Sequence, residues 1–291
     1  QPARAAGDPF GQHHSPAAQI TPDNVKRLTP AWTHRNGDMA AEQGAPSSVS
    51  AQATPVLLPR EAGEHLVYCT PFNRVFALDP QNGRERWVYD PQVPRTSERP
   101  YRCRGVAYAE VPQADVAAAC RHRIYTVTVD RRLIALDARN GQVCAGFGNR
   151  GVVTLVEHAR YGLEKVSSSS APVVANGVVV VGSSIIDFAH AEAPRGVIAA
   201  YDAETGAPRW TFDPLAGVTG TGAGNAWAPL AVDAASDLVF VPTSAPSPDY
   251  YGGLRPGRNE HANSVVALRL ATGEVAWSFQ LVHHDLWDYD T

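Results

Sequence analysis

The sequence predicts an all-β fold in which a four-stranded antiparallel unit is repeated along the chain. The first observation is the segment VFALDPQNGRERWVYD at residues 75–90, which returns as LIALDARNGQVCAGFG, VIAAYDAETGAPRWTFD and VVALRLATGEVAWSFQ. The second is that every copy joins two apolar runs through a polar turn that closes on a glycine, at Gly83, Gly141, Gly206 and Gly273. Separations of 58, 65 and 67 residues between these glycines indicate an array of repeated supersecondary units.

The turn glycines have a conformational reason. A hairpin this tight needs a positive φ at its closing residue, and glycine reaches that region without steric cost. Four residues after the glycine, the second copy carries Ala145, whereas the other three carry a tryptophan, namely Trp87, Trp210 and Trp277.

Four four-stranded units can be written along the chain. The first two are predicted at residues 50–58, 65–70, 74–79 and 84–90, then 104–110, 123–130, 133–137 and 142–147. The third and fourth are predicted at residues 169–176, 178–182, 196–202 and 208–213, then 227–233, 238–242, 264–270 and 274–280. Four-stranded sheets repeated around an axis are typical of a β-propeller, so each unit is predicted to be one blade.

The domain organisation rests on an N-terminal strand without partners. Residues 1–47 form an N-terminal segment whose predicted strand, 31–35, carries Trp32, as the last strand of a blade does. That strand is expected to complete the last blade and close the ring. Residues 48–291 supply blades one to four and the start of the next link. Because four blades do not close a ring of this size, we expect a chain truncated at its C-terminus, with two open sheet edges.

Composition argues against several classes of partner. The net charge of −4 is small and interspersed, with no basic run, which disfavours nucleic acid and anionic membrane surfaces. No apolar stretch of this chain approaches the roughly 18 residues that a membrane-spanning helix needs.

The four cysteines match no metal-binding CxxC spacing. Cys69, Cys103, Cys120 and Cys144 are expected to be buried thiols or to form one or two disulfides, which would imply an oxidising compartment. If disulfides form, the pairing that we expect first is Cys120–Cys144, within the second unit.

Polar and aromatic residues gather where a propeller opens. The inner-strand entries, the second-to-third-strand loops and the blade-to-blade links lie on one face of such a fold. The residues expected there are Gln52, Arg104, Ser169, Trp227, Ser184, Asp187, His283, His284, Asp285, Trp287 and Asp288. Carboxylates, a guanidinium, hydroxyls and an indole converging on one mouth predict a cofactor pocket.

Five segments carry a resemblance to a known family: ITPDNVKRLTPAW, CRGVAY, SSAPVVANGVVVVGSS, GNAWAPLAVD and VHHDLWDYD. The chain resembles the quinoprotein dehydrogenases, which use pyrroloquinoline quinone (PQQ) in an eight-bladed propeller. It is most similar to their membrane-bound glucose and quinate/shikimate branch. The resemblance implies PQQ-dependent oxidation of a sugar or cyclic polyol hydroxyl, with hydride transfer to the quinone and electrons passed to ubiquinone. It also implies a periplasmic enzyme, associated with the membrane through a segment outside this chain, of which this piece alone is inactive.

The resemblance assigns two carboxylates to the chemistry. Asp288 matches the catalytic carboxylate, a general base for the substrate hydroxyl proton that also reaches the metal. Asp187 matches a metal ligand, and Ca²⁺ or Mg²⁺ is the expected ion because hard cations prefer oxygen ligands. The structural alternative is that these carboxylates cap a turn or bond their own loop backbone.

The resemblance assigns five further residues to PQQ. Trp227 matches the indole on which the quinone lies, and Arg104 is a forked donor for a cofactor carboxylate or carbonyl. Ser169 and Ser184 match hydroxyl contacts to the cofactor. Gln52 stands where alcohol-oxidising relatives carry a glutamate that touches it. The structural alternatives are a blade-core aromatic for the indole, a surface salt bridge for the arginine and turn residues for the serines.

Two positions depart from a simple metal site. Ala245 stands where alcohol-oxidising relatives have an asparagine ligand, so the metal shell should be thinner, or completed by Asp288, a backbone carbonyl or water. His283 and His284 are adjacent and would point to opposite faces of a strand, so we expect structural hydrogen bonds from them.

Two rival functions were weighed. A PQQ alcohol dehydrogenase that passes electrons to a cytochrome is disfavoured by Ala245 and Gln52. A cofactor-free propeller that serves as a protein-binding scaffold would have no reason to gather Asp187, Trp227 and Asp288 on one mouth.

Overall fold

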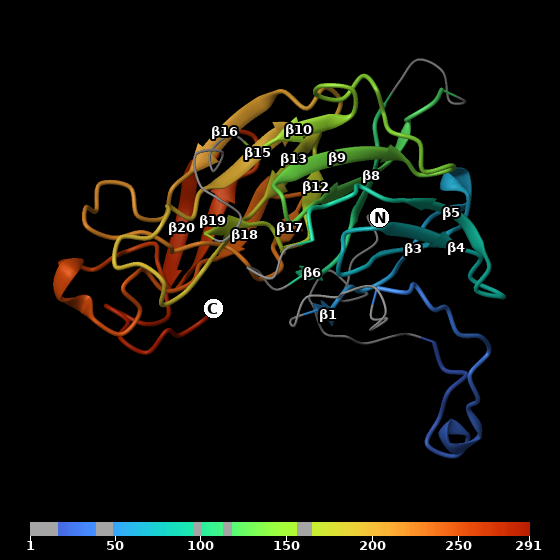
Figure 1. Cartoon of the computed structure of the whole chain (residues 1–291), viewed down its shortest axis with the longest axis horizontal. Coiled ribbons are helices and arrows are strands. Elements are labelled where there is room, and N and C mark those ends of the chain that lie inside the picture. Colours follow the sequence, from blue (N-terminus) through green and yellow to red (C-terminus); the bar gives the residue numbers. More distant parts are fainter. Residues whose placement is uncertain (1–16, 39–48, 96–100, 113–117, 156–164) are drawn as a thin grey trace.

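Within the described residues the strands form four antiparallel sheets of four strands each, as predicted, and two short two-stranded sheets (Figure 1). The computed structural model describes residues 17–38, 49–95, 101–112, 118–155 and 165–291. Blades one and two are β2 (Val56–Leu57), β3 (Leu66–Cys69), β4 (Val75–Leu78) and β5 (Glu85–Tyr89), then β7 (Ala107–Glu110), β8 (His122–Val127), β9 (Arg132–Asp137) and β10 (Val152–Thr154). Blades three and four are β12 (Val173–Ala175), β13 (Val178–Val181), β15 (Ile198–Asp202) and β16 (Pro208–Phe212), then β17 (Ala231–Asp233), β18 (Leu238–Pro242), β19 (Ser264–Arg269) and β20 (Val275–Gln280).

The blades follow one another across the molecule. In Figure 1 they run from β3, β4 and β5 at one side to β18, β19 and β20 at the other. Strand β12 packs beside both β7 and β17, so the first strands of neighbouring blades lie together, as inner strands do around a propeller axis. Helices within the described residues are single 3₁₀ turns, η1 (Val25–Arg27), η3 (Arg60–Ala62) and η5 (Gly252–Leu254). The predicted all-β propeller architecture is confirmed.

The hydrophobic core lies between neighbouring blades. Because successive side chains of a strand point to opposite faces, β13 sends Val179 and Val181 toward blade two. It sends Val178 and Val180 toward blade four. All four side chains are buried. Because such a strand is covered on both faces, its sequence is a continuous run of apolar residues, and the repeats show this pattern.

The turn glycines have a second role that the sequence did not reveal. Each has the expected positive φ, and three of them also lie under a tryptophan from the preceding unit. A Cβ on Gly141 would lie 2.5 Å from Cε3 of Trp87, and one on Gly273 would lie 2.6 Å from Cδ2 of Trp210. The indole N–H of Trp87 donates to the carbonyl of Ala138 at 3.2 Å. The tryptophans therefore interlock adjacent blades.

The fourth strand of blade two is not where the repeat predicted it. Within residues 142–147 only Val143 bridges the sheet, opposite Leu136. Strand β10 instead pairs with β9, with Val152 opposite Ile134. This copy lacks the tryptophan, and Gly148 and Gly151, both at positive φ, turn the chain back toward β9.

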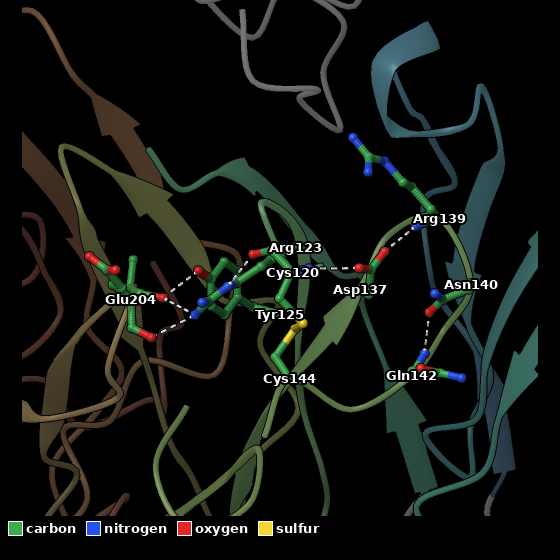
Figure 2. The surroundings of a disulfide bond; sticks show 10 residues. Cys120, Arg123, Tyr125, Asp137, Arg139, Asn140, Gln142, Cys144 and Glu204 are labelled. Carbon is green, nitrogen blue, oxygen red and sulfur yellow. Dashed lines mark hydrogen bonds between the residues drawn. A yellow bond between two sulfur atoms is a disulfide. The ribbon is translucent and has the colours of Figure 1, made fainter. Parts of the chain in front are cut away.

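The predicted disulfide Cys120–Cys144 holds this irregular segment. Around it, Arg123 donates to the backbone carbonyls of Ala203 and Glu204 at 2.9 and 2.7 Å, so blade two is bound to the turn of blade three (Figure 2). A second disulfide joins Cys69 to Cys103.

The predicted inner strands are shorter than expected. The predicted strand 50–58 divides into β2 and β1 (Val49–Ala51), and β1 pairs in parallel with β6 (Tyr101–Cys103). The inner strands of blades two, three and four begin at Ala107, Val173 and Ala231, three to four residues after the predicted starts. The polar entry residues therefore lie outside the sheet hydrogen-bond ladders.

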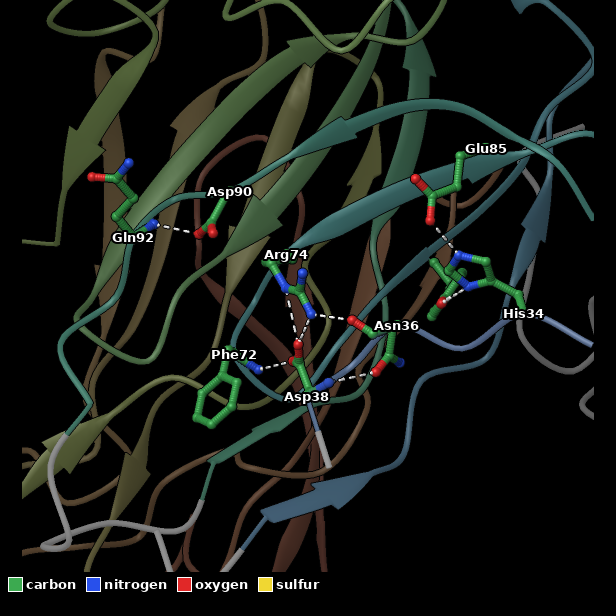
Figure 3. Close-up of polar contacts among 9 residues, drawn as sticks. His34, Asn36, Asp38, Phe72, Arg74, Glu85, Asp90 and Gln92 are labelled. Carbon is green, nitrogen blue, oxygen red and sulfur yellow. Dashed lines mark hydrogen bonds and ion pairs between the residues drawn. The ribbon is translucent and has the colours of Figure 1, made fainter. Parts of the chain in front are cut away.

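The N-terminal segment lies against blade one. Residues 31–35 are not assigned to a strand, but Trp32 covers Gly83 and donates to the carbonyl of Pro80 at 3.2 Å. Asp38 is fully buried, pairs with Arg74 and accepts a hydrogen bond from the backbone N–H of Phe72 (Figure 3). His34 is hydrogen-bonded to Glu85 at 2.7 Å in the same region. Trp32 thus makes on blade one the contact that a preceding blade would make.

In the described part of the chain we find no helix with the length and apolar character needed to cross a bilayer.

Candidate active site

Three carboxylates from three separate loops meet at one mouth of the propeller. Asp187 follows β14 (Ser184–Ile185), Asp249 lies between β18 and β19, and Asp288 lies in the segment after β20. One oxygen of each carboxylate lies within 4.8 Å of the other two. Two of the three, Asp187 and Asp288, were predicted from the sequence, and the structure brings them together.

Asp249 is the residue that the sequence reasoning missed. It lies in the long Pro/Gly/Tyr-rich connection that begins near Ala245, and it is 4% exposed. Ala245 itself is buried, and its carbonyl accepts a hydrogen bond from Gly224 at 3.0 Å. A third carboxylate therefore joins Asp187 and Asp288 in the acidic cluster, and the composition of the metal shell near Ala245 stays a prediction. The only available signal was a lone Asp in a loop without periodicity.

Backbone hydrogen bonds hold the cluster in place. The Oδ2 atom of Asp249 accepts from the backbone N–H of Phe188 at 3.0 Å, which ties the Asp187 loop to the Asp249 loop. Asp285, buried, accepts from the backbone N–H groups of Trp287 at 3.1 Å and Tyr289 at 2.8 Å. These contacts wrap the chain around Asp288, which has a φ of 57°.

Asp288 has a perturbed acidity. Burial raises its pKa to about 6, and the neighbouring carboxylates of Asp187, Asp249, Asp290 and Asp285 contribute in the same direction. A carboxyl with this pKa is mostly ionised at neutral pH, yet it holds a proton more readily than an ordinary aspartate. That is the property of a general base, and a cation at the cluster would also relieve the repulsion.

A second group of predicted residues lies beside the carboxylates. The guanidinium carbon of Arg104 lies 4.7 Å from the centroid of the Trp227 ring, and Nη1 of Arg104 donates to Ser169 Oγ at 2.7 Å. The indole N–H of Trp227 donates to Asp290 Oδ1 at 3.0 Å. Because Asp290 is two residues from Asp288, this hydrogen bond links the indole to the acidic cluster.

Three other predicted residues make further contacts. Ser184 lies in β14 opposite Ser167 of β11 (Val166–Ser167). Gln52 is exposed, and its amide donates to Ser50 at 3.1 Å. Among the described residues, Gln52 makes no hydrogen bond to Arg104 or Trp227. Nδ1 of His284 is hydrogen-bonded to the carbonyl of Gly257 at 2.8 Å, the structural role that we expected for this histidine.

The residues around the mouth fit a planar, anionic cofactor. The Oγ atoms of Ser168 and Ser183, which border β11 and β14, are buried and lack a hydrogen-bond partner within the described residues. Arg104 supplies the charge that carboxylates and carbonyls of such a ligand require, and Trp227 supplies a flat apolar ring, one face of which lies against Arg104.

The chain also has a cleft of about 1020 Å³ away from these residues. It is lined by parts of β7, β8 and β12 and by neighbouring loops and turns, among them residues 108–112 and 174–177. It contains none of the site residues predicted from the sequence.

The chain was compared with known proteins. The family described as "PQQ: Glucose/ethanol/alcohol dehydrogenase, beta-propeller domain" matches residues 3–291. The quinoprotein glucose dehydrogenase of Escherichia coli is 38% identical over 300 residues, which cover 96% of this chain and 37% of the relative. The quinate/shikimate dehydrogenase (quinone) of Acinetobacter baylyi is 36% identical, over 94% of this chain and 36% of the relative.

A solved structure supports the same assignment. The quinohemoprotein alcohol dehydrogenase of Comamonas testosteroni superposes with a TM-score of 0.76 at 26% identity, over 98% of this chain and 42% of that one. The chain thus spans well under half the length of these relatives. With the propeller, the carboxylate mouth and a family match over nearly all of its length, the chain belongs to the PQQ-dependent quinoprotein dehydrogenase family.

Proposed function

We propose that the full-length protein oxidises a hydroxyl group of a sugar or cyclic polyol in a PQQ-dependent reaction. The observation that carries the proposal is the convergence of Asp187, Asp249 and Asp288 beside the Trp227–Asp290 hydrogen bond. Relatives that are 36–38% identical are named glucose, quinate/shikimate and glycerol dehydrogenases, which supports a polyhydroxylated substrate.

In this proposal each residue has one physical task. Asp288 takes the proton of the substrate hydroxyl, for which its raised pKa suits it. Asp187 and Asp249, with Asp288, hold Ca²⁺ or Mg²⁺ through carboxylate oxygens. Trp227 supports the ring system of PQQ, while Arg104, Ser169 and Ser184 bind its polar periphery. Bound PQQ would supply the two-electron oxidation by accepting hydride from the carbinol carbon.

The four blades are proposed to belong to a ring of eight. Trp32 covers Gly83 of blade one as Trp87 covers Gly141 of blade two, so residues 17–38 would stand where the last blade meets the first. The rest of the site would then come from parts of the protein beyond these blades.

The compartment and the electron acceptor belong to the same proposal. Two disulfides are typical of an oxidising compartment, which favours the periplasm. A quinone acceptor at the membrane is proposed because one relative is named as a quinone-dependent dehydrogenase. The alternative, an alcohol dehydrogenase with a cytochrome acceptor, is kept because of the similarity to the quinohemoprotein structure.

Reconstitution of the full-length protein tests the function. With PQQ and Ca²⁺ or Mg²⁺, we expect dye reduction with glucose or quinate, and a dye rate with ethanol at least tenfold lower. A preference for ethanol would favour the alternative. Absence of PQQ-dependent turnover with every substrate would refute both.

A further inference from the structure

An exposed aromatic side chain follows each of the three clustered carboxylates, and Tyr289, which follows Asp288, is 53% exposed. Phe188 follows Asp187 and is 62% exposed, and Tyr250 follows Asp249 and is 64% exposed. Their rings are stacked, with centroids 5.0 Å apart and planes inclined by 17°. The loops that carry Phe188 and Tyr250, here called the aromatic rim, come from blades three and four and are far apart in the sequence. Two large apolar faces thus stand in water beside the acidic cluster.

The aromatic rim is fixed to the cluster by its own backbone. The N–H of Phe188 donates to Oδ2 of Asp249, so the residue that carries one ring is bonded to the carboxylate that precedes the other. Phe188 has a φ of 58°, a left-handed conformation that bulky side chains rarely adopt. Such a conformation persists only where surrounding contacts enforce it, and it is common at binding sites.

We propose that the aromatic rim binds the ring of a cyclic polyol and thereby selects cyclic over open-chain substrates. This inference rests on the proposed function and narrows its substrate class. In a pyranose or cyclohexane polyol, the C–H groups on one side of the ring form a flat apolar face, while the hydroxyls point outward. An aromatic ring offers a rigid apolar surface for that face at a low cost in side-chain entropy. The hydroxyls of a ring held there would extend toward the carboxylates, whereas an open-chain polyol has no such face.

Charge argues against a lipid surface as the occupant. Asp187, Asp249, Asp288 and Asp290 lie around the same mouth. An anionic membrane would be repelled by these carboxylates. Hydroxyl groups, in contrast, donate hydrogen bonds to carboxylates, so an acidic site with an aromatic edge suits the hydroxyl groups of a polyol.

The test uses full-length holoenzyme with Phe188→Ala and Tyr250→Ala. For glucose and quinate we expect KM to rise about tenfold, equivalent to about 1.4 kcal/mol, with kcat changed less than about twofold. For glycerol we expect KM to stay within about twofold. Tyr250→Phe should behave as the wild type because it keeps the ring. Tyr251→Ala is the matched control, since Tyr251 is 62% exposed and adjacent to the stacked pair.

A binding measurement separates this inference from the proposed function. Saturation-transfer NMR on the same proteins should show contact with the ring protons of glucose, and Phe188→Ala should weaken it. Equal effects on cyclic and open-chain substrates, or unchanged KM for both, would overturn the inference while leaving the dehydrogenase intact. Loss of binding to anionic vesicles with unchanged KM would identify the rim as a membrane contact and also overturn it. If the wild-type protein oxidises no polyol, the proposed function fails, and the NMR contact still decides whether the rim binds a cyclic polyol.

Discussion

Asp288 is distinguished by the carboxylates that crowd it. In the metal-free full-length protein, we expect its carboxyl to titrate with a pKa of about 6, because burial and like charge disfavour the ionised form. Asp187→Asn removes one neighbouring charge and should lower that pKa. Carbon-detected NMR of labelled aspartate measures both values. An ordinary aspartate pKa near 4 in the wild type would contradict this electrostatic account of the cluster.

We expect Asp249 to be a metal ligand alongside Asp187 and Asp288. Asp249→Asn should weaken Ca²⁺ or Mg²⁺ binding by about tenfold or more, since an amide lacks the charge that a hard cation prefers. Calorimetric titration of the full-length protein measures the change. Asp90→Asn is the control, because Asp90 lies in blade one and accepts only a local bond from Gln92 (Figure 3). Equal affinities in Asp249→Asn and the wild type would remove Asp249 from the metal site.

Residues of the site could be predicted only where a local pattern marked them. Asp288 stands in a distinctive Trp-Asp pair, and Trp227 and Arg104 lie at strand entries, where the repeat places side chains on the mouth. Asp249 reaches the cluster because the connection between β18 and β19 folds back. That path depends on tertiary contacts, and no periodicity in the sequence encodes it. The contact of Gln52 with the cofactor stays a prediction, and its amide donates to Ser50.

At the scale of single elements, the interlock of tryptophan and glycine can be tested by adding one methyl group. Gly141→Ala would bring a Cβ to 2.5 Å from Trp87 and retain a φ of +73°, so blade one must separate from blade two. We expect a loss of about 2–4 kcal/mol in unfolding free energy from strain and overpacking together. Urea denaturation of the full-length protein measures it.

Gly177→Ala is the matched control for that experiment. Gly177 has a nearly identical φ of +74°, but a Cβ there would have nothing within 4 Å. Only the cost of the left-handed backbone, about 1–2 kcal/mol, should remain. Equal losses for the two variants would show that the tryptophan contact contributes nothing.

The turn aspartates contribute a pH-dependent stability. In blade three, burial alone would raise the pKa of Asp202, but hydrogen bonds from Arg209 and Thr205 outweigh it and lower that pKa to about 2. A carboxyl with a depressed folded-state pKa stabilises the fold above its unfolded value of about 4, and this stability is lost as the pH falls toward 2. The Asp202→Asn variant should therefore be less stable than the wild type at pH 6, and this difference in unfolding free energy should shrink as the pH falls to 2.5. A difference that does not change with pH would contradict the ionic role of Asp202.

The outer hairpin of each blade shows where the sequence repeat predicts the structure correctly and where it does not. Blades one, three and four carry the full hairpin with its tryptophan, and their outer strands lie where the repeat predicted. Blade two lacks the tryptophan and is held by Cys120–Cys144, so its outer strand is displaced to β10. A disulfide and two positive-φ glycines override the repeat, and the repeat alone carries no information about them.

At the scale of the whole molecule, one disulfide joins blade one to the segment that leads to blade two, and the other lies within blade two. Cys69–Cys103 connects β3 of blade one with β6, the segment that leads to Arg104 and blade two. Each disulfide closes a loop of 34 or 24 residues, worth about 3–4 kcal/mol in the chain-entropy account. The propeller class followed from repeat period and strand pattern, because each hairpin unit encodes its own strands and turn. Contacts between blades and between long loops remained hidden because they join residues that share no local pattern.

The central claim is that this mouth belongs to a PQQ-dependent dehydrogenase with Asp288 as its base. The most direct measurement is PQQ-dependent dye reduction by the full-length protein and by Asp288→Asn, each reconstituted with metal. We predict substrate oxidation that requires PQQ and falls at least a hundredfold in the variant, within the range of a lost general base, while the variant still binds PQQ. A variant that binds PQQ and turns over at the wild-type rate would contradict the account.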